Sequence, residues 1–121
     1  MILGTGIDLV SISRFREMPR KEQLATRILT DAEFDEYAVT DDQGLYLARA
    51  WAIKESVSKS FGTGIAGKVM WKNMQLKYTE LGQPRIQFNK ELHRDGIQCH
   101  VSVSHDGDRL VANAILSLLV N

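Results

Sequence analysis

The spacing of apolar residues changes twice along this 121-residue chain, and that change limits the folds it can adopt. Residues 2–10 are dominated by Ile, Leu, Thr and Val, as in a β-strand, whereas the middle of the chain has helical spacing. Period-two alternation begins at about Lys68. Strands at both ends and helices between them predict an α+β domain with a mostly antiparallel sheet and a long central helix. At this length we expect one domain spanning residues 1–121.

The helical part is expected to contain several segments. The stretch around Pro19 should form two short helices or a helix and a turn, because proline interrupts a helix. Thr30 and Glu33 form a capping box, which predicts a helix running from there to about Ala38. The longest helix should end at Gly62. Its apolar stripe has six members: Leu47, Ala48, Trp51, Ala52, Val57 and Phe61.

The second half of the chain is expected to be mainly extended. The predicted elements are a hairpin with strands 71–79 and 85–89 joined by a turn at 81–84, a short helix over 90–94, a strand around 99–103, a turn at 105–108 and a last strand over 110–120.

Composition excludes several classes of partner. Fifteen basic and fifteen acidic residues cancel, which argues against non-specific binding to nucleic acid or to an anionic membrane. No segment is apolar over the length of a membrane span, and the first residues lack the layout of a signal peptide. The single cysteine, Cys99, cannot form an internal disulfide and fits a reducing compartment, so we expect a cytoplasmic protein.

Positive charge is nevertheless concentrated between residues 14 and 27. Five basic residues there outnumber Glu17 and Glu22, whereas residues 31–42 hold six acids and no base. This stretch could bind an acidic partner, and an ordinary solvated helix surface explains it equally well. The five residues are Arg14, Arg16, Arg20, Lys21 and Arg27.

An aspartate, Asp8, lies in the middle of the first predicted strand. A carboxylate between Ile7 and Leu9 is costly to bury unless a cation or hydrogen-bond donors satisfy it. Gly4 and Gly6 share its face of the strand; they leave room for a ligand or another backbone, or they mark a bulge. Magnesium would satisfy such an aspartate, because it needs only one or two protein carboxylates when phosphate and water complete its shell.

A second carboxylate, Glu55, is four residues before Lys59 on the same face of the long predicted helix. A surface ion pair between them is the simpler explanation. The turn Gly62-Thr63-Gly64 follows within one helical turn, however, and its bare backbone could approach phosphate oxygens closely. With Asp8, these residues could supply a metal ligand pair, a cation and a space for phosphate.

The dipeptide His105-Asp106 forms a further polar cluster at a predicted strand end. A histidine there could move a proton near neutral pH, or the segment could be an ordinary polar turn. A zinc site built from Cys99, His100 and His105 is disfavoured, because Cys99 and His100 point to opposite faces of a strand.

Taken together, five segments resemble the bacterial holo-acyl-carrier-protein synthases, which are small 4′-phosphopantetheinyl transferases. The resemblance covers essentially the whole chain and rests on GTGIDLVSISRF, RILTDAEFDEY, WAIKESVSKSFGTGI, the ELGQP turn and HVSVSHD…ANAIL. It implies the fold of that family and transfer of 4′-phosphopantetheine from coenzyme A to a serine of apo acyl carrier protein. It also implies adenosine 3′,5′-bisphosphate as the second product, a magnesium cofactor, and a homotrimer with active sites between subunits.

The resemblance also implies a set of site residues. Asp8 and Glu55 would hold the metal, and Lys59 and His105 would join them in catalysis. The residues implied for coenzyme A are Lys59, Gly62, Thr63, Gly64, Gln83, Pro84 and His105, with the Gln83-Pro84 turn contributed by the neighbouring subunit. The residues implied for the carrier protein are Arg14, Met18, Arg20, Lys21 and Arg27.

One helix position departs from the family pattern. The family usually has an arginine directly before the aromatic residue of this helix, whereas here the order is Arg49-Ala50-Trp51. One residue turns a helical side chain by about 100°, so Arg49 is not expected to replace that arginine directly. We therefore expect different phosphate or carrier contacts at Ala50.

Two other functional classes also fit part of the pattern. A metal-dependent phosphodiesterase would use Asp8 and Glu55, but the sequence offers no further acidic ligands for a two-metal site. A non-catalytic module that binds coenzyme A or a nucleotide would bind the same ligand without turnover. For a transferase, the acceptor of the serine proton could be a metal-bound water, Glu55 or His105.

Overall fold

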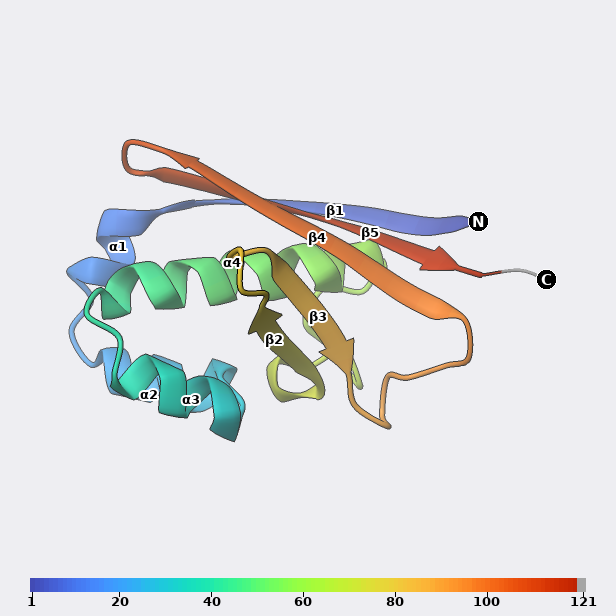
Figure 1. Cartoon of the computed structure of the whole chain (residues 1–121), viewed down its shortest axis with the longest axis horizontal. Coiled ribbons are helices and arrows are strands. Elements are labelled where there is room, and N and C mark those ends of the chain that lie inside the picture. Colours follow the sequence, from blue (N-terminus) through green and yellow to red (C-terminus); the bar gives the residue numbers. More distant parts are fainter. Residues whose placement is uncertain (120–121) are drawn as a thin grey trace.

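The computed structural model describes residues 1–119 and confirms the α+β class. A three-stranded antiparallel sheet has the order β1-β5-β4, built from β1 (Ile2–Ser11), β5 (Arg109–Leu118) and β4 (Ile97–Asp106). A separate antiparallel hairpin pairs β2 (Met74–Tyr78) with β3 (Pro84–Phe88). The longest helix, α4 (Gln43–Ser60), lies along one face of the three-stranded sheet (Figure 1).

Three shorter helices complete the helical layer. They are α1 (Ile12–Arg16), α2 (Lys21–Ile28) and α3 (Asp31–Ala38). Of the two alternatives expected around Pro19, the structure has the two short helices. The capping box of Thr30 and Glu33 is also present at the start of α3. Helices α2 and α3 lie on the side of α4 away from the sheet (Figure 1). Because α4 is covered on both sides, 11 of its residues are buried.

Two predictions for residues 71–94 need correction. Residues Trp71–Asn73 form a short 3-10 helix, so the first hairpin strand begins only at Met74. The helix predicted over 90–94 is wrong: a single turn is closed there by Asn89, which accepts from the backbone N–H groups of Glu91, Leu92 and His93. One such turn satisfies the local groups without nucleating a helix.

The C-terminal hairpin also differs slightly from its prediction. His105 and Asp106 are still paired in β4, so the turn itself is confined to residues 107–108. Strand β5 ends at Leu118, and the predicted end of this strand at residue 120 lies outside the described residues. None of the helices in residues 1–119 is long and apolar enough to cross a membrane.

Candidate functional site

Asp8, Glu55 and Lys59 come together where β1 runs along α4. The Lys59 Nζ lies 3.1 Å from Asp8 Oδ1 and donates a 2.9 Å hydrogen bond to the carbonyl of Ile7. Burial raises the pKa of Glu55, and the charge of Asp8 raises it further, while Lys59 lowers it. Lys59 therefore pairs with Asp8, and the surface pair between Glu55 and Lys59 considered above is not present in residues 1–119.

Two glycines allow β1 to approach α4 this closely. A Cβ atom on Gly6 would lie 1.8 Å from the carbonyl oxygen of Ser56, and one on Gly4 would lie 2.1 Å from that of Ser60. The strand and helix backbones are thus in direct contact, which is one of the two explanations offered by the sequence. A register shift between Ile2 and Gly4 shows that the strand also bulges there.

One oxygen of the Asp8 carboxylate, Oδ2, is buried without a hydrogen-bond partner among residues 1–119. An unsatisfied buried carboxylate oxygen is costly, so this atom fits a ligand that is not part of the chain. Together with the carboxylate of Glu55, it forms a pair of hard oxygen donors suited to Mg²⁺. Within residues 1–119 no group of three or more metal-ligating side chains exists.

The Gly62-Thr63-Gly64 turn follows directly after Lys59. Gly62 has φ 82° and Gly64 has φ 66°, a left-handed backbone that favours glycine. The N–H of Gly62 donates to the carbonyl of Lys59 and that of Gly64 to the carbonyl of Ser58, which fixes the turn against the helix end. A Cβ on either glycine would meet nothing within 4 Å, so this backbone borders open space next to the lysine.

Gln83, Pro84 and His105 lie elsewhere in the chain. Gln83 and Pro84 line a groove of about 560 Å³ between β3 and β4, and β4 is the opposite edge of the sheet from β1. His105 lies near the end of β4 beside a smaller depression. In the described part of the chain no hydrogen bond joins these three residues to Asp8, Glu55 or Lys59. Within one chain the predicted set is therefore distributed over both edges of the sheet and the β2–β3 hairpin.

The basic stretch is mostly exposed, but one member is neutralised. Arg16 forms a 2.7 Å ion pair with Asp42, whereas Arg14 lies over the ring of Phe15 at 5.1 Å. The exposed residues of the set are Arg14, Arg16, Arg20 and Arg27, and Met18 and Lys21 are half-buried beside them.

The start of α1 is capped by a distant residue that sequence reasoning missed. Asp108 accepts a 2.7 Å hydrogen bond from the N–H of Ser13 and further bonds from the hydroxyls of Ser11 and Ser13. The turn between β4 and β5 therefore anchors the first basic helix. No local pattern reveals a cap that lies so far along the chain.

Ala50, where the helix departs from the family pattern, and its neighbour Arg49 lie in different environments. Ala50 is fully buried, whereas the guanidinium of Arg49 lies 5.1 Å from the ring centroid of Tyr78. Tyr78 pairs with Pro84 across the hairpin, so Arg49 lies near the Gln83-Pro84 turn. The Nε atom of Arg49 is buried and has no hydrogen-bond partner among residues 1–119. Contact with the Tyr78 ring thus fixes the position of the Arg49 charge, which helical spacing alone does not predict.

Comparison with known proteins identifies the family and the fold. A model of the 4′-phosphopantetheinyl transferase superfamily matches residues 4–116. The holo-[acyl-carrier-protein] synthase of Nitrosospira multiformis is 38% identical over 96% of this chain and 98% of its own length. The crystal structure of the synthase from Neisseria meningitidis superposes with a TM-score of 0.87 at 32% identity, covering 97% of this chain and 99% of that one. A structure from Bacillus anthracis in complex with CoA (3′,5′-ADP) has a TM-score of 0.82 at 28% identity and covers 96% of both chains.

Proposed function

Because the chain belongs to the 4′-phosphopantetheinyl transferase superfamily, we propose that it moves 4′-phosphopantetheine from coenzyme A to a serine of an apo acyl carrier protein. Membership makes the protein an enzyme of this transferase class, and the resemblance to bacterial holo-acyl-carrier-protein synthases is confirmed. The second product would be adenosine 3′,5′-bisphosphate. The observation that carries the proposal is the buried, unsatisfied oxygen of Asp8 beside Glu55 and Lys59.

Asp8 and Glu55 would hold a magnesium ion. When bound, Mg²⁺ neutralises charge on the pyrophosphate oxygens of coenzyme A and stabilises the charge that develops during phosphoryl transfer. Lys59 is 46% exposed and would add a fixed positive charge on the same side, next to the open Gly62-Thr63-Gly64 backbone. These residues would orient the phosphorus for attack by the incoming serine.

The residue that accepts the serine proton depends on how the subunits assemble. Glu55 has a raised pKa, which makes its carboxylate a stronger base than an ordinary one. His105 of the same chain lies at the far edge of the sheet, so we propose that it would act only in the site of a neighbouring subunit. A metal-bound water remains the third candidate.

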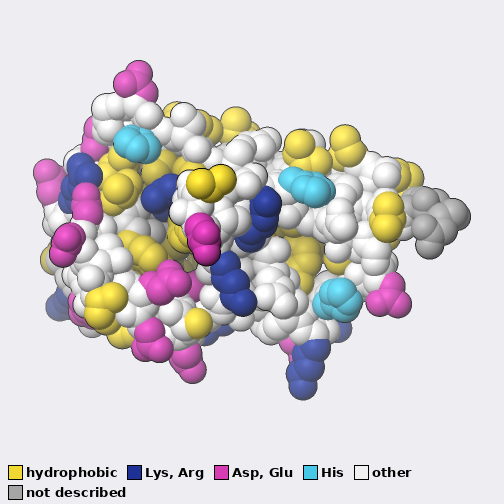
Figure 2. Space-filling view, viewed as in Figure 1, with side chains coloured by type: hydrophobic (Ala, Val, Ile, Leu, Met, Phe, Trp, Pro, Cys, Tyr) yellow, Lys and Arg dark blue, Asp and Glu magenta, His cyan; other side chains and the backbone are white. Residues whose placement is uncertain are grey.

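We propose a homotrimer in which each site is shared by two subunits. The separation of Asp8 from Gln83, Pro84 and His105 supports this, because a second copy could place its own Gln83, Pro84 and His105 beside Asp8. On the face of the three-stranded sheet turned away from α4, the β1 edge is also apolar: Ile7 and Leu9 are each 63% exposed. Figure 2 shows hydrophobic side chains projecting along the upper edge of the molecule, over this sheet. A neighbouring subunit would remove that surface from water.

The proposed docking surface for the carrier protein is the basic stretch that includes α1 and α2. Arg14, Arg20 and Arg27 are exposed, and in the described residues none of the three forms an ion pair. Unpaired surface cations attract an acidic partner and mainly increase the association rate. Arg16 is expected to contribute less because Asp42 already neutralises it. A cytoplasmic location is part of the same proposal.

Intact-mass spectrometry of an apo acyl carrier protein tests the function directly. Incubation with the protein, coenzyme A and Mg²⁺ should add about 340 Da, the mass of the transferred phosphopantetheine group, and EDTA should prevent the gain. Asp8→Ala and Glu55→Ala should abolish the gain while the variants keep the wild-type circular dichroism spectrum. Full Mg²⁺-dependent activity in either variant would contradict the metal assignment.

Two other outcomes would support the rival classes. Binding of coenzyme A without any mass gain across several carrier proteins would indicate a non-catalytic binding module. Release of phosphopantetheine in the absence of a carrier protein would indicate a metal-dependent phosphodiesterase.

A further inference from the structure

A buried ion pair lies on the side of α4 that faces α3 and β2. The side chains of Glu33 and Lys54 are both 0% exposed, and Lys54 Nζ lies 2.6 Å from Glu33 Oε1. The same ammonium donates to the carbonyls of Ile28 at 2.9 Å and Trp71 at 3.0 Å. All three of its protons are therefore used, each by a different segment of the chain.

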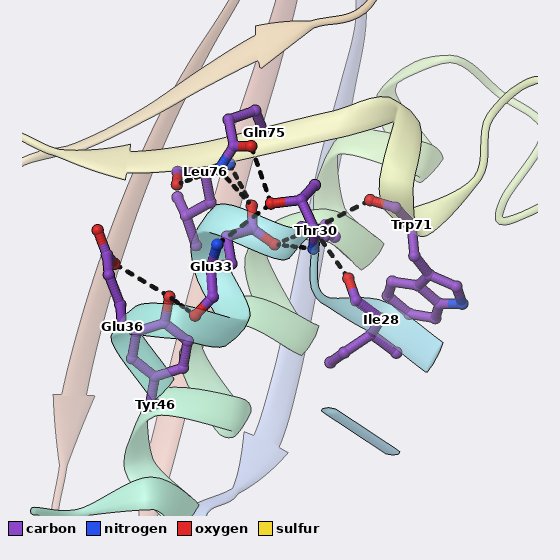
Figure 3. Close-up of polar contacts among 9 residues, drawn as sticks. Ile28, Thr30, Glu33, Glu36, Tyr46, Trp71, Gln75 and Leu76 are labelled. Atoms are coloured by element: carbon purple, nitrogen blue, oxygen red, sulfur yellow. Dashed lines mark hydrogen bonds and ion pairs between the residues drawn. The ribbon is translucent and has the colours of Figure 1, made fainter. Parts of the chain in front are cut away.

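The carboxylate of Glu33 is equally well satisfied. It accepts from the N–H of Thr30 at 2.9 Å, from the N–H of Leu76 at 2.5 Å and from the side-chain amide of Gln75 at 3.2 Å (Figure 3). The pair thus joins the end of α2, the start of α3, the middle of α4 and strand β2. Glu33 is in addition the third residue of the capping box, so one carboxylate both starts α3 and holds α4.

The opposite side of α4 is held by the glycines of β1. Gly4 and Gly6 leave space that is filled by the backbone of Ser60 and Ser56. Successive residues of a helix are about 100° apart, so Lys54 and Ser56 are separated by about 200° and lie on nearly opposite sides. Glu55 lies halfway between them, on the face of the helix that it shares with Lys59, whose ammonium contacts Asp8.

We propose that Glu33 and Lys54 form a positioning pair for the metal-binding carboxylate, because they fix the rotation of α4 that directs Glu55 toward Asp8. The inference rests on the proposed metal site. Stability alone does not account for the pair, since a buried ion pair can often be replaced by apolar residues of similar volume without loss. A small rotation of α4 would move Glu55 out of the donor set while leaving the helix folded, and such misplacement has large effects on catalysis.

The double variant Glu33→Gln/Lys54→Met tests this inference. It removes both charges at once. The N–H of Thr30 and that of Leu76 donate to different oxygens of Glu33, so the single glutamine carbonyl keeps one of these two bonds. Tyr37→Phe is the matched control, because it removes only the hydroxyl that donates a 3.2 Å hydrogen bond to Glu22 and keeps the ring that packs beside Tyr46 of α4. Thermal melting would first establish that both variants are folded.

The deciding measurement is binding of Mn²⁺, titrated by electron paramagnetic resonance, together with steady-state kinetics. Loss of a group that orients a metal ligand typically weakens metal binding by about 10–100-fold. We expect a loss of this size in the double variant, a fall in kcat, and an unchanged KM for the carrier protein. Tyr37→Phe should match the wild type in all three quantities.

Two results would overturn the inference, and they differ in meaning. Wild-type Mn²⁺ affinity and kcat in a folded double variant would reduce the pair to a packing element while leaving the proposed function intact. Failure of the wild-type chain itself to bind Mn²⁺ would overturn the metal site and the positioning role together. If the double variant does not fold, Lys54→Arg, which keeps the charge but not the geometry of the three ammonium hydrogen bonds, must still show the loss of Mn²⁺ affinity against the same control.

Discussion

Replacing Gly6 with alanine should damage both stability and catalysis, because it separates β1 from α4. The added Cβ would lie 1.8 Å from the carbonyl oxygen of Ser56 and 2.9 Å from the backbone nitrogen of Ser60. Contacts of a Cβ atom below 3.0 Å are essentially never observed, so strand and helix must separate by at least 1.2 Å, which is 3.0 minus 1.8. Both contacted atoms, of Ser56 and Ser60, belong to the backbone, so no side-chain rotation can relieve the clash.

The size of the effect follows from this forced movement. Overpacking of a well-packed interior costs about 1–3 kcal/mol, and a clash with backbone belongs at the upper end of that range. For a chain of this length, about 3 kcal/mol corresponds to a decrease in Tm of roughly 10 °C. Asp8, two residues further along the same strand, would move with it, and a displacement of about 1 Å can reduce the catalytic rate about 100-fold.

Thermal melting and the carrier-protein mass assay, both performed on Gly6→Ala, would check these two effects. Gly107→Ala is a suitable control, because Gly107 also restricts substitution, through its φ of 58°, but has nothing within 4 Å of the added Cβ. It should lose only about 1 kcal/mol, from left-handed backbone strain, and keep its activity. A Gly6→Ala protein with wild-type Tm and activity would refute the close approach of β1 and α4 as the feature that holds the site.

Three other substitutions test separate parts of the proposal. Leu9→Lys places a charge on the exposed sheet face and should convert the proposed trimer to a monomer in size-exclusion chromatography with light scattering; an unchanged mass would argue against that face. Hydrogen bonds from Ser11 and Ser13 hold the pKa of Asp108 below its ordinary value. The stabilisation is therefore complete above the ordinary aspartate pKa of about 3.9 and is lost as the pH falls through the lower folded pKa. Asp108→Ala should remove this part of the acid dependence of Tm between pH 5 and pH 2, and an identical acid profile would contradict the cap. Arg49→Ala should raise the KM for coenzyme A several-fold with little change in kcat, and an unchanged KM would show that this cation is not used.

Local patterns predict much of this protein because the decisive contacts are short in sequence. Glu55 and Lys59 lie four residues apart, so helical spacing places them on one face, and Thr30 and Glu33 form their capping box within one turn. Gly4 and Gly6 have no side chains, which indicates that another part of the chain can approach this strand closely. These features were available before any tertiary structure was known.

Other features depend on residues that meet only after folding. The spacing of Glu33 predicts a helix start but says nothing about Lys54, which reaches it from another helix. The position of the Arg49 guanidinium depends on the ring of Tyr78, which lies on strand β2 and not on α4. No helix forms at residues 90–94, because Asn89 accepts hydrogen bonds from the backbone N–H groups of this segment. In each case a distant or competing partner decides the outcome.

Strand β1 carries two unrelated requirements on alternate residues. Asp8 faces α4, whereas Ile7 and Leu9 face the sheet surface on which the proposed subunit contact depends. A shift of one residue would exchange the two faces, directing an isoleucine into the metal site and a carboxylate into the contact. Insertions and deletions within these ten residues should therefore be tolerated far less well than substitutions, since each would remove assembly and chemistry at the same time.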